Sequence, residues 1–205
     1  MSELDLIAPL SSLAFGFSLG FIHAFDADHL MAISVMAQGK KKASSYLQYS
    51  SRWALGHGAV LLILGMLLTG FGFTLPDAVA AWSEKLIGLL LIIFGSLLLA
   101  QLHIKTKANA SKGHKGTPLF IGVIHGFAGN APVLALLPAL SQSSITAAIS
   151  YLFLFSLGLL ASMTLFAFSL SLIQRRLQQH PMWLRYATTG IGMTSMLVGA
   201  LWLSH

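Results

Sequence analysis

Long apolar runs separated by short polar segments dominate the pattern of this chain. About six of these runs are long enough to cross the roughly 30 Å hydrocarbon layer of a bilayer as helices. They lie near 12–37, 51–73, 82–103, 117–140, 145–173 and 184–204. The pattern predicts an all-α polytopic membrane protein with about six transmembrane helices, built as a single membrane domain over residues 1–205.

The first apolar stretch, from Leu6 to Met36, is longer than one crossing needs. We expect Pro9 to mark the start of a short interfacial segment that precedes the crossing. A broken or tilted first helix is the alternative, because tilting also accommodates excess apolar length.

Basic residues are concentrated in every second connection between the apolar runs. Eleven of the 12 Lys and Arg residues lie in the connections 38–52, 103–116 and 174–185. Basic loops beside transmembrane helices face the cytoplasm. We therefore expect both termini to face outward from a bacterial cytoplasmic (inner) membrane, with the lipid bilayer as the main partner. The basic excess then reports orientation, and no nucleic-acid partner is expected.

Composition narrows the protein class and the possible metal ligands. Only 9% of the residues are charged, which excludes an ordinary soluble domain. The absence of cysteine excludes disulfides and thiolate metal sites. Four tryptophans lie near predicted span ends, as an aromatic belt at the membrane interface would: Trp53, Trp82, Trp183 and Trp202.

Two parts of the chain resemble each other at a fixed offset of 102 residues. Gly20–Phe25 (GFIHAF) aligns with Gly122–Phe127 (GVIHGF), and the Leu-Gly pair at 55–56 aligns with that at 157–158. Gly88 and Gly95 match Gly192 and Gly199 at an offset of 104. The spacing predicts two three-helix repeats, about 7–103 and 117–204. An odd number of spans makes the repeats inverted, with a binding site between them near the bilayer midplane.

The first run contains the segment HAFDADH, which places His23, Asp26, Asp28 and His29 at bilayer depth. One carboxylate at that depth costs about 2.5–3.5 kcal/mol on insertion scales, so four ionisable groups indicate function. Imidazole nitrogen and carboxylate oxygen together are ligands for a divalent transition metal. On a straight helix Asp28 points roughly opposite His23. Either Asp28 has another partner, or the helix is locally unwound there.

Further candidate ligands lie in the second and fourth runs. His57 stands between two glycines, which allow close approach of a helix or an ion. His125 and Asn130 occupy the fourth run, where nearby glycines and Pro132 predict a broken helix. A single membrane histidine is usually a packing residue, but three histidine-bearing runs favour ligand roles for His57 and His125.

The segment from His23 to His29 resembles the His-x4-Asp-His signature of the nickel–cobalt transporter family. Leu55-Gly56-His57 is similar to the second-helix motif of that family. The segment HGFAGN, residues 125–130, resembles the fourth-helix motif of a short six-span subgroup that includes urease-accessory membrane proteins. The resemblance implies a permease for Ni2+ or Co2+ in which His23, Asp28 and His29 are essential, accompanied by Asp26 and His57.

The leading hypothesis is a secondary permease that imports Ni2+, and also Co2+, through this His/Asp site, with no enzymatic activity and no cofactor besides the transported ion. Uptake should fall at acid pH, because histidine must be neutral to bind metal. Export of the same ions is the first alternative, and the sequence does not choose between nickel and cobalt. A b-type cytochrome and an intramembrane metallohydrolase are weaker alternatives. The sequence does not determine whether the chain forms a homo-oligomer.

Overall fold

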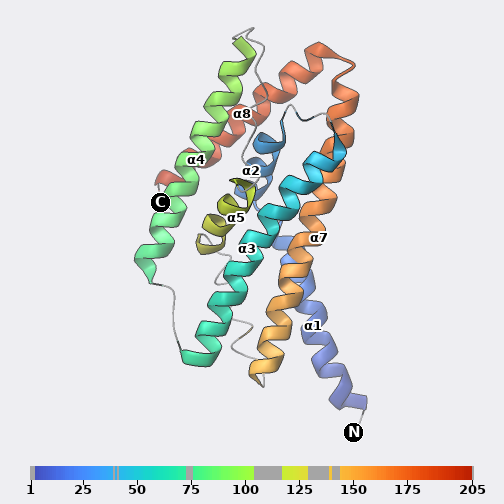
Figure 1. The fold of residues 1–205 in the computed structure, drawn as a ribbon, viewed down its shortest axis with the longest axis vertical. Helices are drawn as coiled ribbons and strands as arrows, with labels where there is room; N and C mark the ends of the chain where they lie inside the picture. The colour runs from blue at the N-terminus through green and yellow to red at the C-terminus, as the bar shows by residue number, and fades with distance from the viewer. Residues whose placement is uncertain are drawn as a thin grey trace.

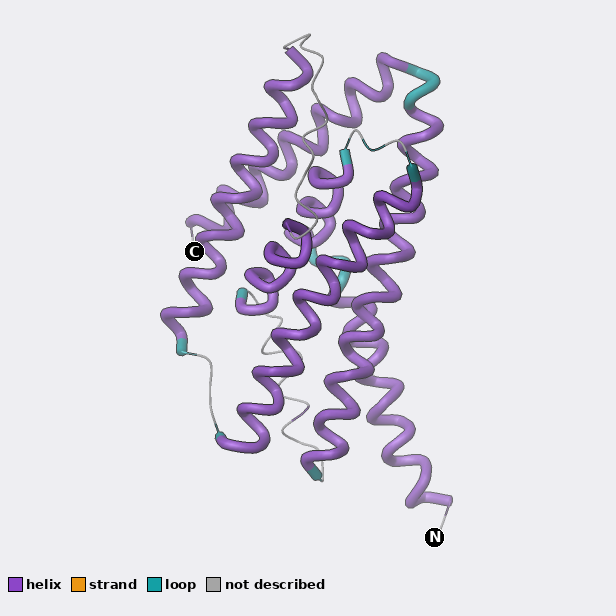
Figure 2. The backbone as a smooth tube through the Cα atoms, in the orientation of Figure 1, coloured by secondary structure: helices purple, strands orange, loops and turns teal. Residues whose placement is uncertain are grey.

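The computed structural model describes residues 3–38, 40, 42–72, 76–103, 117–128, 139 and 144–204. All regular structure in these residues is helical (Figures 1 and 2). The helices are α1 (Glu3–His23), α2 (Ala27–Ala37), α3 (Ala43–Phe71), α4 (Asp77–His103), α5 (Thr117–Phe127), α7 (Ile145–Leu177) and α8 (Pro181–Ser204). The predicted all-α class is therefore confirmed for the described residues.

Four of the described helices are long and apolar enough to cross a membrane: α3, α4 over Asp77–Ala100, α7 and α8. Three shorter apolar helices accompany them, namely Leu13–His23 of α1, α2 and α5. The first predicted run is thus two helices, which is the broken-helix alternative. The second half of the fourth predicted run, residues 129–138, lies outside the described residues.

Helix α3 begins at Ala43, whereas the sequence pattern starts the second run at 51 and leaves 38–52 as a connection. No glycine or proline interrupts residues 43–55, so the helix continues beyond the apolar run. Tyr46 and Ser50 on this extra length are buried against the rest of the bundle. Packing therefore extends the helix into a segment that polarity alone marks as a loop.

The helices pack mainly as four pairs, α4 with α8, α3 with α7, α1 with α7, and α3 with α5. In Figure 1 the ends of α2, α4 and α7 and the starts of α3 and α8 lie together at the top. The end of α3 and the start of α7 lie at the opposite end. The described basic residues Lys40 and Lys42, between α2 and α3, and Arg175 and Arg176, in the last turn of α7, therefore lie toward the same end of the bundle.

Glycines let the helix backbones touch at the pair interfaces. A Cβ on Gly20 of α1 would overlap the carbonyl of Phe155 in α7, and one on Gly122 of α5 would overlap that of Trp53 in α3. The same holds for Gly56 against Leu119 and for Gly158 against Phe17. In α4 and α8, Gly88 lies against Gly199 and Gly95 against Gly192. These crossings are close because neither helix has a side chain between them.

Candidate metal centre

The chain breaks its helix inside the HAFDADH segment. Helix α1 ends at His23, and α2 begins at Ala27 after Asp26, whose backbone is extended with φ −58° and ψ 140°. The turn is closed by the Asp26 N–H, which donates to the His23 carbonyl at 3.1 Å. Asp28 then lies in the first turn of α2, where the helix dipole favours a carboxylate. Because the helix is broken between them, Asp28 does not have to point away from His23, as it would on a straight helix.

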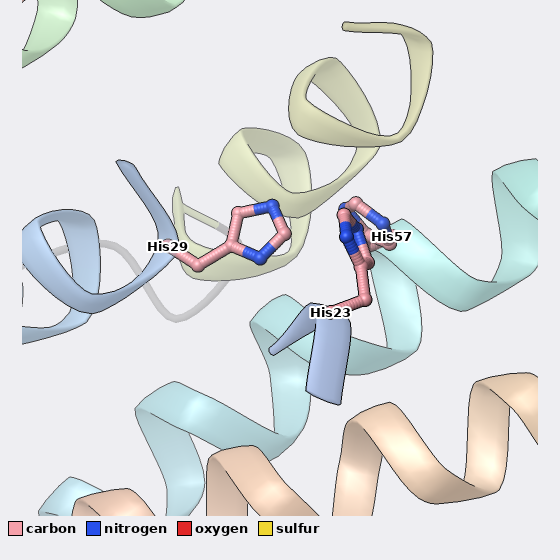
Figure 3. Close-up of side chains that lie close together, drawn as sticks. All are labelled: His23, His29 and His57. Atoms are coloured by element: carbon pink, nitrogen blue, oxygen red, sulfur yellow. The ribbon is translucent and has the colours of Figure 1, made fainter. Parts of the chain in front are cut away.

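Three imidazoles from three helices meet at this break. His23, His29 and His57 each offer a ring nitrogen, and these nitrogens all lie within 4.8 Å of one another. The ring centroids are 4.7 Å apart for His23 and His29, 5.1 Å for His29 and His57, and 5.5 Å for His23 and His57. Figure 3 shows the three rings turned toward one another from α1, α2 and α3. All three side chains are buried.

His125, near the end of α5, forms a fourth side of the cluster. Its Nδ1 lies 2.9 Å from the Ile121 carbonyl, so this nitrogen carries the proton and donates it. The remaining nitrogen, Nε2, is buried without a hydrogen-bond partner and lies 4.0 Å from Oδ2 of Asp28. Nε2 therefore keeps its lone pair directed at the side of the cluster where Asp28 lies, as in imidazoles that bind metals.

The two carboxylates differ in exposure. Asp28 is buried, and its Oδ2 lies 3.8 Å from Nε2 of His29. The Asp26 side chain is 48% exposed, and its Oδ2 contacts Nδ1 of His23 at 2.9 Å. Asp26, Asp28 and His29 make a second group whose ligand atoms lie within 4.8 Å of one another. The predicted ligand Asn130 lies outside the described residues.

Several ring nitrogens of the cluster are buried without a hydrogen-bond partner in the described structure. They are both nitrogens of His57, both nitrogens of His23, Nδ1 of His29 and Nε2 of His125. Buried polar groups in proteins are nearly always paired, so a concentration of unpaired ones needs an explanation. Imidazole nitrogens suit borderline divalent ions of the first transition row. The donor set therefore fits such an ion as a substrate.

Trp53 is part of the cluster, and its assignment to an interfacial belt is wrong. It is fully buried, with ring centroids 4.7 Å from His29 and 5.1 Å from both His57 and His125. Trp53 and His57 are four residues apart on α3, so they share one helix face. That spacing is the signal that could have identified it. Trp82 and Trp183 are exposed, as a belt requires.

Apolar side chains separate the cluster from the end of the bundle that carries Lys40. Ile33 of α2 and Met163 of α7 are fully buried beside Trp53. Farther along the same helices, the amide of buried Gln174 in α7 donates to the side-chain oxygen of Gln38 after α2. These two sets of side chains form two layers between the cluster and that end of the bundle.

Comparison with known proteins gives one close relative and one more distant relative. The chain is 32% identical over 198 residues to the urease accessory protein UreH of Bacillus sp. (strain TB-90), covering 88% of this chain and 85% of that protein. It is 28% identical over 170 residues to the chloroplast protein FOR GROWTH AND FERTILITY 2 of Arabidopsis thaliana, covering 75% of this chain and 45% of that protein. No family model and no solved structure matches. The extent of the first match shows that this chain belongs to the family of the urease accessory protein UreH.

Proposed function

We propose that the protein is a secondary permease that imports Ni2+ or Co2+ across the bacterial cytoplasmic membrane. The observation that carries the proposal is the buried cluster of His23, His29 and His57, whose nitrogens include several with no partner in the described structure. Apolar helices around the cluster support a membrane setting. The resemblance of the HAFDADH segment to the nickel–cobalt transporter signature supports the choice of ions.

The donor geometry is compatible with a transition-metal ion after small side-chain movements. Nitrogens that bind one tetrahedral ion at 2.0–2.1 Å lie about 3.3 Å from each other. The ligand atoms of the cluster already lie within 4.8 Å of one another. Side-chain rotations that move the nitrogens by about an ångström bring them to the shorter distance. The backbone therefore does not need to move. Loss of hydration at the ion is then offset by the three imidazoles.

We further propose six crossings, arranged as inverted repeats over about 7–103 and 117–204. The glycine contacts support this arrangement, because the pair Gly20–Phe155 becomes the pair Gly122–Trp53 at the offset of 102. Leu91 lies in the third crossing of the first repeat, and Ser195 lies in the third crossing of the second repeat, 104 residues later. The Ser195 hydroxyl donates to the Leu91 carbonyl at 2.9 Å. Contacts that map onto themselves when the halves are exchanged are those expected around a two-fold axis.

The transport cycle follows from the differing exposure around the site. The ion reaches the cluster at the exposed carboxylate of Asp26 and exchanges waters for imidazoles. Rocking of the two halves then opens the layers formed by Met163 and by the Gln38–Gln174 pair. The basic residues at this end support a cytoplasmic position for it, with both termini outside. A membrane potential of ~100 mV contributes about 4.6 kcal/mol for a divalent ion that moves inward.

Cellular accumulation of radioactive nickel and cobalt at submicromolar concentration tests the proposal. We expect uptake by the native chain, loss of uptake in His23→Ala, and normal uptake in the matched control His180→Ala, which changes an exposed histidine. Expression of each variant is measured in the membrane fraction. Reduced accumulation by the native chain would indicate export, and equal uptake by the His23 variant would remove the cluster from the mechanism.

A further inference from the structure

The centre contains two overlapping sets of ligands, and a single ion cannot use all of them at once. One set is Asp26, Asp28 and His29, and the other is His23, His29 and His57. We propose that they are successive stations for one divalent ion, an oxygen-rich station that receives it and a nitrogen-only station that selects it, with His29 common to both. This inference rests on the proposed function as a metal permease.

The two stations differ in their access to solvent. The receiving station begins at the Asp26 side chain, which is 48% exposed, and continues to Asp28, of which 5% is exposed. In the selecting station, His23 is 4% exposed, His29 2% and His57 0%. Exposure thus falls in one direction through the pair of stations. An ion can keep several waters at the first station and must lose most of them at the second.

Two buried imidazole nitrogens flank the buried carboxylate of the receiving station. Nε2 of His125 has no hydrogen-bond partner and lies 4.0 Å from Oδ2 of Asp28. On the opposite side, Nε2 of His29 lies 3.8 Å from the same oxygen. Asp28 therefore stands between two imidazoles at a distance that is long for hydrogen bonds and short enough for a shared ion. His125 adds a fourth donor to this station.

The chemistry of the ligands separates their tasks. Carboxylates and water are accepted by every divalent ion, including Mg2+ and Ca2+. A site made only of imidazoles disfavours those hard ions and suits nickel and cobalt. The receiving station has two carboxylates among its donors, so it raises the local concentration of divalent ions and discriminates among them less than the selecting station does. Selection takes place at the second step, when the ion exchanges oxygen ligands for His23 and His57.

The contact of Asp26 with His23 gives the exchange a structural basis. Asp26 Oδ2 lies 2.9 Å from Nδ1 of His23, although the two atoms do not form a hydrogen bond in this arrangement. With the ion at the selecting station, a small rotation lets Asp26 accept the Nδ1 proton. This contact orients the ring and leaves Nε2 as the metal ligand, as carboxylates do for histidines that bind metals. With the ion at the receiving station, the same carboxylate binds the ion. Asp26 thus alternates between two partners.

Visible absorption of Co2+ distinguishes the stations in the purified full-length chain, reconstituted in lipid nanodiscs. Co2+ with three imidazoles and few waters absorbs strongly, whereas hydrated six-coordinate Co2+ absorbs weakly. We expect the strong spectrum for the native chain. We expect His57→Gln to retain stoichiometric Co2+ binding with the weak spectrum. The control His180→Gln, at an exposed histidine, should give the native spectrum.

Stopped-flow binding of Co2+ tests the receiving station. We expect Asp26→Asn to reach the strong spectrum at saturation about tenfold more slowly, and to lose the slowing that millimolar Mg2+ causes in the native chain. The matched control is Asp77→Asn, which changes an exposed aspartate at the start of α4. If His57→Gln does not fold, His57→Leu replaces it, since leucine occupies the equivalent position 159.

Three results would overturn the inference. They are a strong spectrum in the folded His57 variant, complete loss of Co2+ binding in that variant, or a native binding rate in Asp26→Asn. Each would leave the proposed permease standing with a single site. If the native chain binds neither Co2+ nor Ni2+ and accumulates neither in cells, the proposed function fails first.

Discussion

The crossing of α1 with α7 and the crossing of α5 with α3 have the same backbone contact and different chemistry. Gly20 lies on the Phe155 carbonyl in the first, and Gly122 lies on the Trp53 carbonyl in the second. His23 is 5.7 Å from the Phe155 ring, and His125 is 5.1 Å from the Trp53 ring. Beyond these histidines, the first half continues with two aspartates and His29, whereas the second has Ala128, Asn130 and Ala131 at the aligned positions.

The difference shows that packing and chemistry are constrained separately in the two halves. Close contact between helices restricts both crossings equally, because any side chain at either glycine would overlap a carbonyl. Ligand chemistry is concentrated in the first half, and the second half contributes His125. Four substitution experiments test this separation.

The largest effect is expected for Gly20→Ala and Gly122→Ala. Each new Cβ would overlap a backbone carbonyl, which cannot rotate away. We expect each variant to lose about 3 kcal/mol or more of folding free energy, at the upper end of overpacking effects. Gly70→Ala is the control, since no atom lies near its added Cβ. Thermal unfolding in detergent measures all three, and clearly unequal losses at positions 20 and 122 would break the equivalence of the crossings.

The second effect concerns position 57 and its counterpart 159. His57→Leu should reduce metal uptake more than tenfold, because it removes one of three buried imidazoles of the cluster. Leu159→Met, a change of similar volume in a buried position, should cost less than about 1.5 kcal/mol of stability and leave uptake close to native. Uptake assays with matched expression check both. Equal losses of uptake would mean that packing, and not ligand chemistry, limits transport at this level.

A smaller difference is expected between the aromatic residues at positions 53 and 155. Trp53→Phe and Phe155→Leu each remove buried volume and should cost about 1–3 kcal/mol of stability. Trp53 contacts three histidines of the cluster, whereas Phe155 contacts His23 alone. Uptake should therefore fall severalfold in the Trp53 variant and less in the other. Co2+ titration of both proteins checks whether affinity follows the same order.

The smallest effect is expected at the α4–α8 pair. Ser195→Ala removes a buried hydrogen bond to the Leu91 carbonyl and should cost about 1 kcal/mol. Ser204→Ala removes an exposed hydrogen bond to the Leu201 carbonyl and should cost less. Neither change touches the cluster, so uptake should remain native in both. A large loss of uptake in Ser195→Ala would show that this pair moves during transport.

The apolar pattern predicts the helical class because its runs are long and the segments between them are polar. It does not predict where helices extend past the apolar core, as α3 does from Ala43. Neither glycine nor proline marks the break after His23, and the local signal is Asp26, a residue type that favours the N-cap position it occupies before α2. From the sequence alone, the break is one of two ways to explain Asp28, which points away from His23 on a straight helix. The other is a separate partner for Asp28.

The candidate site was predictable where residue chemistry is unusual for its depth. His23, Asp28 and His29 are conspicuous as ionisable groups in an apolar run, and the structure places all of them with His57 and His125. Trp53 was missed because an aromatic residue near the end of a run is also what a membrane interface favours. Its spacing of one helical turn from His57 indicates that both side chains lie on the same face of α3, which composition alone does not show.

The glycines at positions 20 and 122 also restrict how this sequence can change over generations. No residue is smaller than glycine, so every missense change at either codon adds atoms where a carbonyl already lies. Such a change cannot be compensated by trimming a neighbouring side chain, because the obstacle is backbone. The two halves are therefore free to diverge in the polar side chains beyond the crossings, while the glycines at the crossings must be inherited unaltered.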